Sequence, residues 1–187
     1  YKIVKWTPDL DLTDFYKECE LRGLENNSSQ RMLVDSLARE DEWCVWVLYY
    51  NDTAIGSVGA HSLDVFPGSY RICVRTCAFT DKLHMPTLRT RDGITTHQHV
   101  TAQIFMPVCI AWAGADKDLY ISTHPSPVGT QRMVHTVWGP SLYRTGVLQK
   151  PVDKLYRGHI QSFWKLNVNE FTKQLNSRPR WLYSVEE

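Results

Sequence analysis

Residues 90–113 read TRDGITTHQHVTAQIFMPVCIAWA, a polar loop with one glycine that becomes an apolar helix near Thr95 or Thr96. Three segments typical of strands precede this loop. The first N–H groups of a helix have no partner within the helix, and the helix dipole adds partial positive charge there. A strand, a glycine-bearing loop and a helix start are together typical of an anion site. We therefore predict that a phosphate-bearing cofactor binds at residues 91–96.

The segment before the loop has the alternation of strands and turns of an antiparallel β-meander. Strands are predicted at residues 43–50, 54–66 and 70–80. These segments are rich in aromatic and β-branched residues, and turn residues separate them. Gly56 and Gly59 in the second strand indicate a bulge or a close backbone approach. Arg71 and Arg75 fall on one side of the third strand, which indicates that this face is at least partly wet.

The flanking segments extend this pattern. Strands are predicted at residues 1–6, 118–123 and 155–168, and helices at residues 11–21, from residue 26, and at 130–143. Asp11 or Thr13 is the expected cap of the first helix. Pro107 should kink or interrupt the central helix, and Gly114 should end it. The resulting order, β-α-α-β-β-β-α-β-α-β, predicts a single mixed α/β domain of residues 1–187.

Charge and cysteine usage limit the partners. The net charge is +1 and no basic stripe occurs, so neither nucleic acid nor an anionic membrane is indicated. No apolar run approaches the ~20 residues that span a bilayer, and the first ten residues lack a secretory apolar region. The five cysteines are odd in number and form no CxxC pair. Buried free thiols of a cytoplasmic protein are the expected outcome.

Two short motifs accompany the element order. Residues 90–95, TRDGIT, overlay the pattern Arg/Gln-x-x-Gly-x-Gly/Ala, with Gly93 as the matching glycine. Thr90 and Thr95 stand where that pattern has Arg/Gln and Gly/Ala. Residues 142–148, LYRTGVL, are similar to a Leu-Tyr-x-x-x-Gly-Phe segment that is one residue longer. With these motifs and the element order of residues 1–168, the chain resembles a divergent member of the GCN5-related N-acetyltransferase (GNAT) superfamily.

The resemblance implies a central, mostly antiparallel sheet in a three-layer α/β/α arrangement and acyl transfer from acetyl-CoA or another acyl-CoA. The acceptor would be an amine on a small molecule or a peptide. The third meander strand and the strand after the central helix would splay, with walls at residues 76–81 and 120–123. The implied cofactor-binding residues are Phe79, Arg89, Arg91, Asp92, Gly93, Ile94, Thr95 and Thr96. Backbone N–H groups of residues 93–96 would hold the pyrophosphate, and the two arginines would add charge-assisted bonds.

The implied chemistry needs an acid for the departing thiolate and a base for the attacking amine. By resemblance Tyr143 is the acid, since a phenol with a reference pKa near ~10 is protonated at neutral pH. Asp81 and His61 are the candidate bases, and each has a plain structural role as its alternative. Main-chain N–H at or near Phe79 would polarise the thioester carbonyl.

Other interpretations stay open. The degenerate glycine loop and the absence of an obvious base favour a non-catalytic acyl-CoA-binding or interaction module on the same fold. A Cys–His hydrolase would use Cys73 or Cys77 with His61, His84 or His124. His97 and His99 are spaced to point in different directions on a helix and no HExxH frame occurs, so no metal site is predicted. The oligomeric state is open, a homodimer included.

Overall fold

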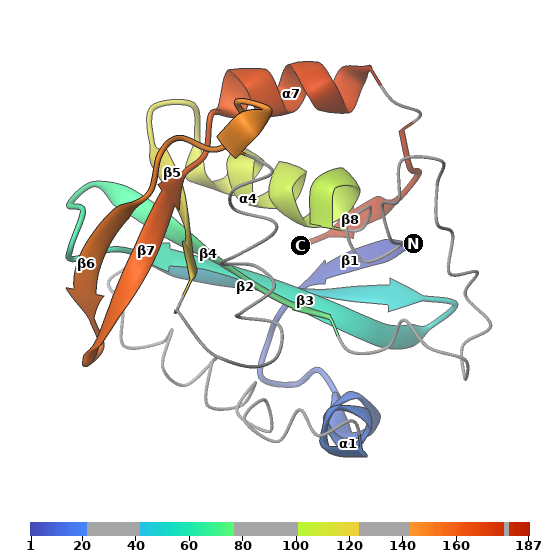
Figure 1. The fold of residues 1–187 in the computed structure, drawn as a ribbon. Coiled ribbons are helices and arrows are strands. Elements are labelled where there is room, and N and C mark those ends of the chain that lie inside the picture. Colours follow the sequence, from blue (N-terminus) through green and yellow to red (C-terminus); the bar gives the residue numbers. More distant parts are fainter. Residues whose placement is uncertain (22–41, 77–100, 124–142, 178–179) are drawn as a thin grey trace. The chain divides into compact units, whose positions relative to one another are not determined.

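Strands dominate the computed structural model, which describes residues 1–21, 42–76, 101–123, 143–177 and 180–187. In chain order the elements are β1 (Lys2–Lys5), α1 (Thr13–Leu21), β2 (Trp43–Tyr50), β3 (Thr53–Ser62), β4 (Ser69–Thr76), the π-helix η3 (Thr101–Phe105), α4 (Met106–Ala113), β5 (Asp118–Thr123), β6 (Val152–Tyr156), β7 (His159–Lys165), α7 (Val168–Asn176) and β8 (Ser184–Glu186). The strands are hydrogen-bonded in the order β6-β7-β5-β4-β3-β2-β1-β8 (Figure 1).

The predicted mixed α/β fold with a mostly antiparallel sheet is confirmed. Among the pairings described, β4 with β5 and β1 with β8 are parallel, and the others are antiparallel. The chain divides into two compact units. The first holds residues 1–61, 73–109 and 181–187, and the second holds residues 62–72 and 110–180. The prediction of a single domain over residues 1–187 stays a prediction.

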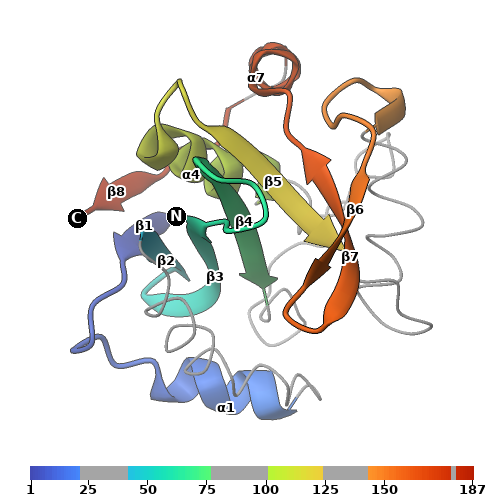
Figure 2. The same cartoon turned by 90° about the vertical axis from the view of Figure 1, so that its left-hand side faces the viewer.

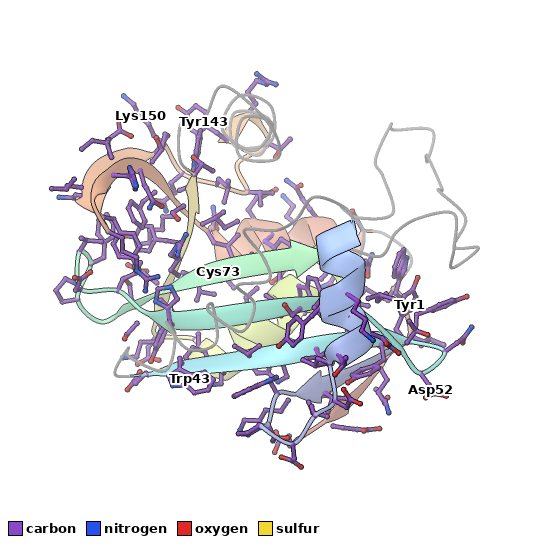
Figure 3. The ribbon with its side chains drawn as sticks, turned by 90° about the horizontal axis from the view of Figure 1, so that it is seen from below. Tyr1, Trp43, Asp52, Cys73, Tyr143 and Lys150 are labelled. Atoms are coloured by element: carbon purple, nitrogen blue, oxygen red, sulfur yellow. The ribbon has the colours of Figure 1, made fainter. Side chains whose placement is uncertain are left out.

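The first unit is built on the β2–β3 hairpin. Asn51 and Asp52 have φ of 46° and 62°, the left-handed conformation that a two-residue hairpin turn requires. Asp52 is labelled in Figure 3. Leu48 lies opposite Gly56, but the next residue, Tyr49, lies opposite Ala54. This shift in register is a bulge in β3, and it lies beside Gly56, one of the two glycines predicted to mark a bulge. The predicted strand at residues 54–66 is too long, because β3 ends at Ser62.

Helices lie on both faces of the strands in this unit. The α1 helix lies on one face, where Leu12 and Phe15 are buried, and the segment from η3 into α4 lies on the other (Figure 1). Asp11 caps α1, since its Oδ1 accepts from Thr13 N at 3.0 Å. The predicted start of the central helix lies outside the described residues. Its hydrogen bonding changes from π to α just before Pro107, where the sequence predicts an interruption.

The second unit holds β5 between β4 and the β6–β7 hairpin (Figure 2). The predicted single strand at residues 155–168 is wrong, because Arg157 and Gly158, with φ of 51° and 81°, turn the chain between β6 and β7. Helix α7, which the sequence analysis did not predict, follows that hairpin. Asn167 caps it through an Oδ1 that accepts from Glu170 N at 3.2 Å. Among the described residues, no helix is long and apolar enough to cross a membrane.

Candidate functional site

The structure describes two of the predicted site residues, and the predicted glycine loop lies outside the described residues. The predicted residues that lie outside the described part of the chain are Phe79, Asp81, Arg89, Arg91, Asp92, Gly93, Ile94, Thr95 and Thr96. The described ones are Tyr143 and His61. What the structure adds is the pairing of the two strands that the resemblance implies as walls.

The parallel ladder between β4 and β5 is short. Its register joins Ser69 to Asp118 and ends at Ile72 with Ile121. Both strands continue beyond that pair, β4 to Thr76 and β5 to Thr123. On its other side, β5 stays paired with β7 as far as Thr123 with Ser162. The ladder therefore ends at Ile121, inside the predicted wall of residues 120–123, and at Ile72, which comes before the predicted wall of residues 76–81.

Tyr143, which is labelled in Figure 3, lies on a turn that several hydrogen bonds fix. Gly146 N donates to Tyr143 O at 3.0 Å, and Gly146 has a φ of 79°. Gln174 of α7 donates through Nε2 to Thr145 O at 2.9 Å, and Asn167 N donates to Val147 O at 2.8 Å. The tyrosine itself is 48% exposed. A phenol held on a fixed turn and open to solvent is able to act as a proton donor.

His61 has a different environment. It lies on β3 opposite Trp43, and its relative exposure is 0%. A general base must come within hydrogen-bond reach of the proton that it removes, directly or through one water. A fully buried imidazole has no surface to offer a substrate, so this placement favours the structural interpretation of His61.

Three buried free thiols lie in the first unit, on β2, β4 and α4: Cys44, Cys73 and Cys109 (Cys73 in Figure 3). Burial raises the pKa of Cys44 and the pKa of Cys109 above the usual value of a thiol. Because the thiolate is the nucleophile, these two groups are poor candidates for covalent chemistry. Cys77, the other nucleophile of the hydrolase interpretation, lies outside the described residues, and within the described part no cluster of three metal-binding side chains occurs.

An open groove of about 470 Å³ lies in the second unit, between the end of α4 and the start of α7. Its charged lining residues are Lys117 and Asp118. The carboxylate of Asp118 is 2.7 Å from Lys165 Nζ, and this hydrogen bond raises the pKa of Lys165. The groove therefore holds a paired acid, Asp118, and one further charged group, Lys117.

Sequence reasoning missed a polar contact near the end of the β4–β5 ladder. Arg71 Nε donates to Ser122 Oγ at 2.6 Å, and its guanidinium lies 5.4 Å from the centre of the Tyr156 ring. The sequence showed Arg71 only as a sign of a wet strand face. The sequence does not show how β4, β5, β7 and β6 pair, and this pairing brings together residues that are far apart in the chain.

No family model matches the sequence, and no curated protein matches it. Solved structures do match the fold. A protein described as an acetyltransferase of the GNAT family from Desulfovibrio desulfuricans is 13% identical over 89% of this chain and 98% of its own, with a TM-score of 0.52. An aminoglycoside 6'-N-acetyltransferase complexed with coenzyme A is 12% identical over 88% of this chain and 95% of its own, with a TM-score of 0.48. Campylobacter jejuni N-acetyltransferase PseH in complex with acetyl coenzyme A is 12% identical over 88% and 97%, with a TM-score of 0.46.

Proposed function

We propose that this chain, which has the fold of the GNAT acetyltransferases, transfers an acyl group from an acyl-CoA to a primary amine. Acetyl-CoA is the first donor to test. The observation that supports this proposal most directly is the short β4–β5 ladder, which ends at Ile72 and Ile121 although both strands continue. In the proposal, the donor lies along β4 and β5 beyond this pair.

The donor assignment rests on the sequence motif. In the proposal, backbone N–H groups of residues 93–96 hold the pyrophosphate, and Arg89 and Arg91 add charge-assisted hydrogen bonds. In the proposal, Asp92 is part of the same predicted loop, and main-chain N–H at or near Phe79 polarises the thioester carbonyl. The donor supplies an acyl group on a thioester, which a neutral amine is able to attack.

In the proposed reaction a nitrogen–carbon bond forms and the carbon–sulfur bond of the thioester breaks. Tyr143 donates its phenolic proton to the departing sulfur, which its exposed position on a fixed turn allows. The amine loses one proton to Asp81 or to solvent, and solvent restores the proton of the phenol. His61 is the weaker candidate base because it is fully buried.

Calorimetry with CoA and with acetyl-CoA is the experiment that tests the proposal, followed by thiol release across a panel of primary amines. We expect both ligands to bind, and acetyl-CoA to release thiol only when an accepted amine is present. Adenosine diphosphate is the matched control, since it carries a pyrophosphate but no pantetheine arm. Gly93→Val should weaken binding of all three ligands, because added bulk disturbs the backbone approach to phosphate.

The outcomes separate the two functions that the sequence allows. Absence of acetyl-CoA binding at millimolar concentration would contradict the donor assignment. Binding without thiol release for any amine would favour the non-catalytic acyl-CoA-binding module.

A further inference from the structure

Arg71 is held in a defined orientation on the second unit. Its Nε donates to Ser122 Oγ at 2.6 Å, and its Cζ lies 5.4 Å from the ring centre of Tyr156. The arginine is half-buried, whereas the tyrosine beneath it is buried. A guanidinium fixed through Nε and one ring face keeps its two Nη groups, a planar pair of donors, in one place.

The surroundings of Arg71 are aromatic. The register of β4, β5, β7 and β6 puts Arg71, Tyr120, Phe163 and Tyr156 on one face of the strands. Phe66 stacks on Tyr120 with ring centres 4.4 Å apart and an interplanar angle of 10°. Phe163 meets the rings of both Phe66 and Tyr156 edge-on. Phe163 and Tyr156 are buried, so the apolar area beside the cation comes from the half-buried rings of Phe66 and Tyr120.

Further positive charge lies beside the aromatic face. Lys154 Nζ lies 5.7 Å from the ring centre of Phe66, and Arg157 Cζ lies 5.1 Å from that of Tyr156. Within the part of the chain that the structure describes, no carboxylate lies at ion-pair distance from Arg71 or Lys154.

Two carboxylates of the same strands are already engaged elsewhere. Asp118 pairs with Lys165 at 2.7 Å. Asp153 lies between Val152 and Lys154 on β6 and so points to the opposite face, where its Oδ1 accepts from Ser162 Oγ at 2.7 Å. Neither carboxylate therefore neutralises the guanidinium of Arg71.

We infer that Arg71 and the half-buried rings of Phe66 and Tyr120 form a subsite for an oxyanion, and that the acceptor amine carries a carboxylate or a phosphate group. The inference rests on the proposed function and names the acceptor class for it. A planar guanidinium binds both oxyanions through paired N–H donors. Arg71 lies one residue before the end of the β4–β5 ladder, next to the proposed path of the acyl group.

Binding of benzoate and of benzamide, measured by ligand-observed NMR without any acyl-CoA, tests the subsite separately from transfer. The two probes share the ring and differ in charge. We expect benzoate to bind and benzamide to bind more weakly. Arg71→Gln should lower benzoate affinity about tenfold, the size of one charge-assisted contact. Lys173→Gln removes the same charge from an exposed site on α7 and should leave benzoate affinity unchanged.

Ser122→Ala is the second variant and keeps the charge. It removes the acceptor that orients Arg71, so benzoate affinity should fall several-fold while the fold, followed by circular dichroism, stays intact. Equal benzoate affinity in the wild type, Arg71→Gln and Ser122→Ala would overturn the inference. So would an equal loss in the Lys173→Gln control, since that result would mean only a general effect of charge.

Acyl transfer from acetyl-CoA provides a second test of the inference. We expect para-aminomethylbenzoate to be a better acceptor than para-aminomethylbenzamide, and Arg71→Gln to abolish the preference without changing acetyl-CoA affinity. A fall in acetyl-CoA affinity would assign Arg71 to the donor phosphates and overturn the acceptor inference. Acetyl-CoA binding with no transfer to either amine would contradict the proposed transfer reaction, while benzoate binding would still decide the subsite.

Discussion

Tyr143 is the described residue on which the proposed chemistry most depends. Its turn is fixed by the bond from Gly146 N and by Gln174, which bonds both Thr145 O and Glu170 Oε1 at 2.9 Å. Helix α7 therefore supports the turn that carries Tyr143. The sequence motif suggested the residue, but only the structure shows that α7, which was not predicted, supports its turn.

Tyr143→Phe should lower turnover and leave donor affinity nearly unchanged. Removal of a general acid costs roughly 10²–10⁴-fold when that acid takes part in the rate-limiting step. The measurement is the rate of thiol release, with the acetyl-CoA dissociation constant from calorimetry as the companion value. Unchanged turnover would remove Tyr143 from the mechanism. The matched control is Tyr183→Phe, which deletes the same hydroxyl in a different segment, before β8, and should leave turnover unaffected.

The buried thiols provide a pH prediction at the same scale. Burial raises the pKa of Cys44 and of Cys109 in the folded chain, whereas an exposed thiol in the unfolded chain has a pKa of about 8.5. Above that value the unfolded state loses protons that the folded state keeps. These groups therefore support stability below about pH 8.5, and their contribution is lost as the pH rises further, by about 1.4 kcal/mol per pH unit for each thiol.

Denaturant unfolding between roughly pH 7 and pH 10 measures this effect, since the thiol reference pKa of about 8.5 lies inside that range. Cys44→Ala should reduce the alkaline slope of the unfolding free energy, although the cavity also lowers stability at every pH. An alkaline slope that is identical in the wild type and in Cys44→Ala would contradict the role of Cys44.

At the scale of elements, the β6–β7 hairpin shows where sequence periodicity fails. Residues 155–168 alternate like one strand, yet Arg157 and Gly158 reverse the chain within them. The alternation survives because a two-residue turn leaves the side-chain period of two intact on each side. Gly158 could have indicated the turn, since a Gly at the second position of such a turn accepts a positive φ.

Gly158→Ala should destabilise the protein, because an alanine at a φ of 81° is strained. Nothing lies within 4 Å of a Cβ built at this position, so the cost is conformational rather than steric and should be about 1–2 kcal/mol. The midpoint of denaturant unfolding measures it. Asn176→Ala, an exposed change at the end of α7, is the control and should shift stability by less. An Ala variant as stable as the wild type would contradict the hairpin turn.

At the scale of the whole molecule, the sequence predicted the elements better than their partners. Strands β2 and β5 begin and end as predicted, because their apolar, β-branched composition is local information. The parallel pairing of β8 with β1 was not predicted, since it joins two ends of the chain and depends on tertiary contacts. For the site, Tyr143 followed from a motif, whereas the contact of Arg71 with Ser122 depends on strand register.

The order of the strands leaves β6 and β8 at the two edges of the sheet. Both are short, at five and three residues, and both carry charge: Asp153 and Lys154 on β6, and on β8 Glu186, which lies 3.7 Å from Lys2. Exposed strand edges are templates for pairing with further chains, and short, charged edge strands are poor templates. The same strand order that places the candidate site therefore protects the protein from edge-to-edge aggregation.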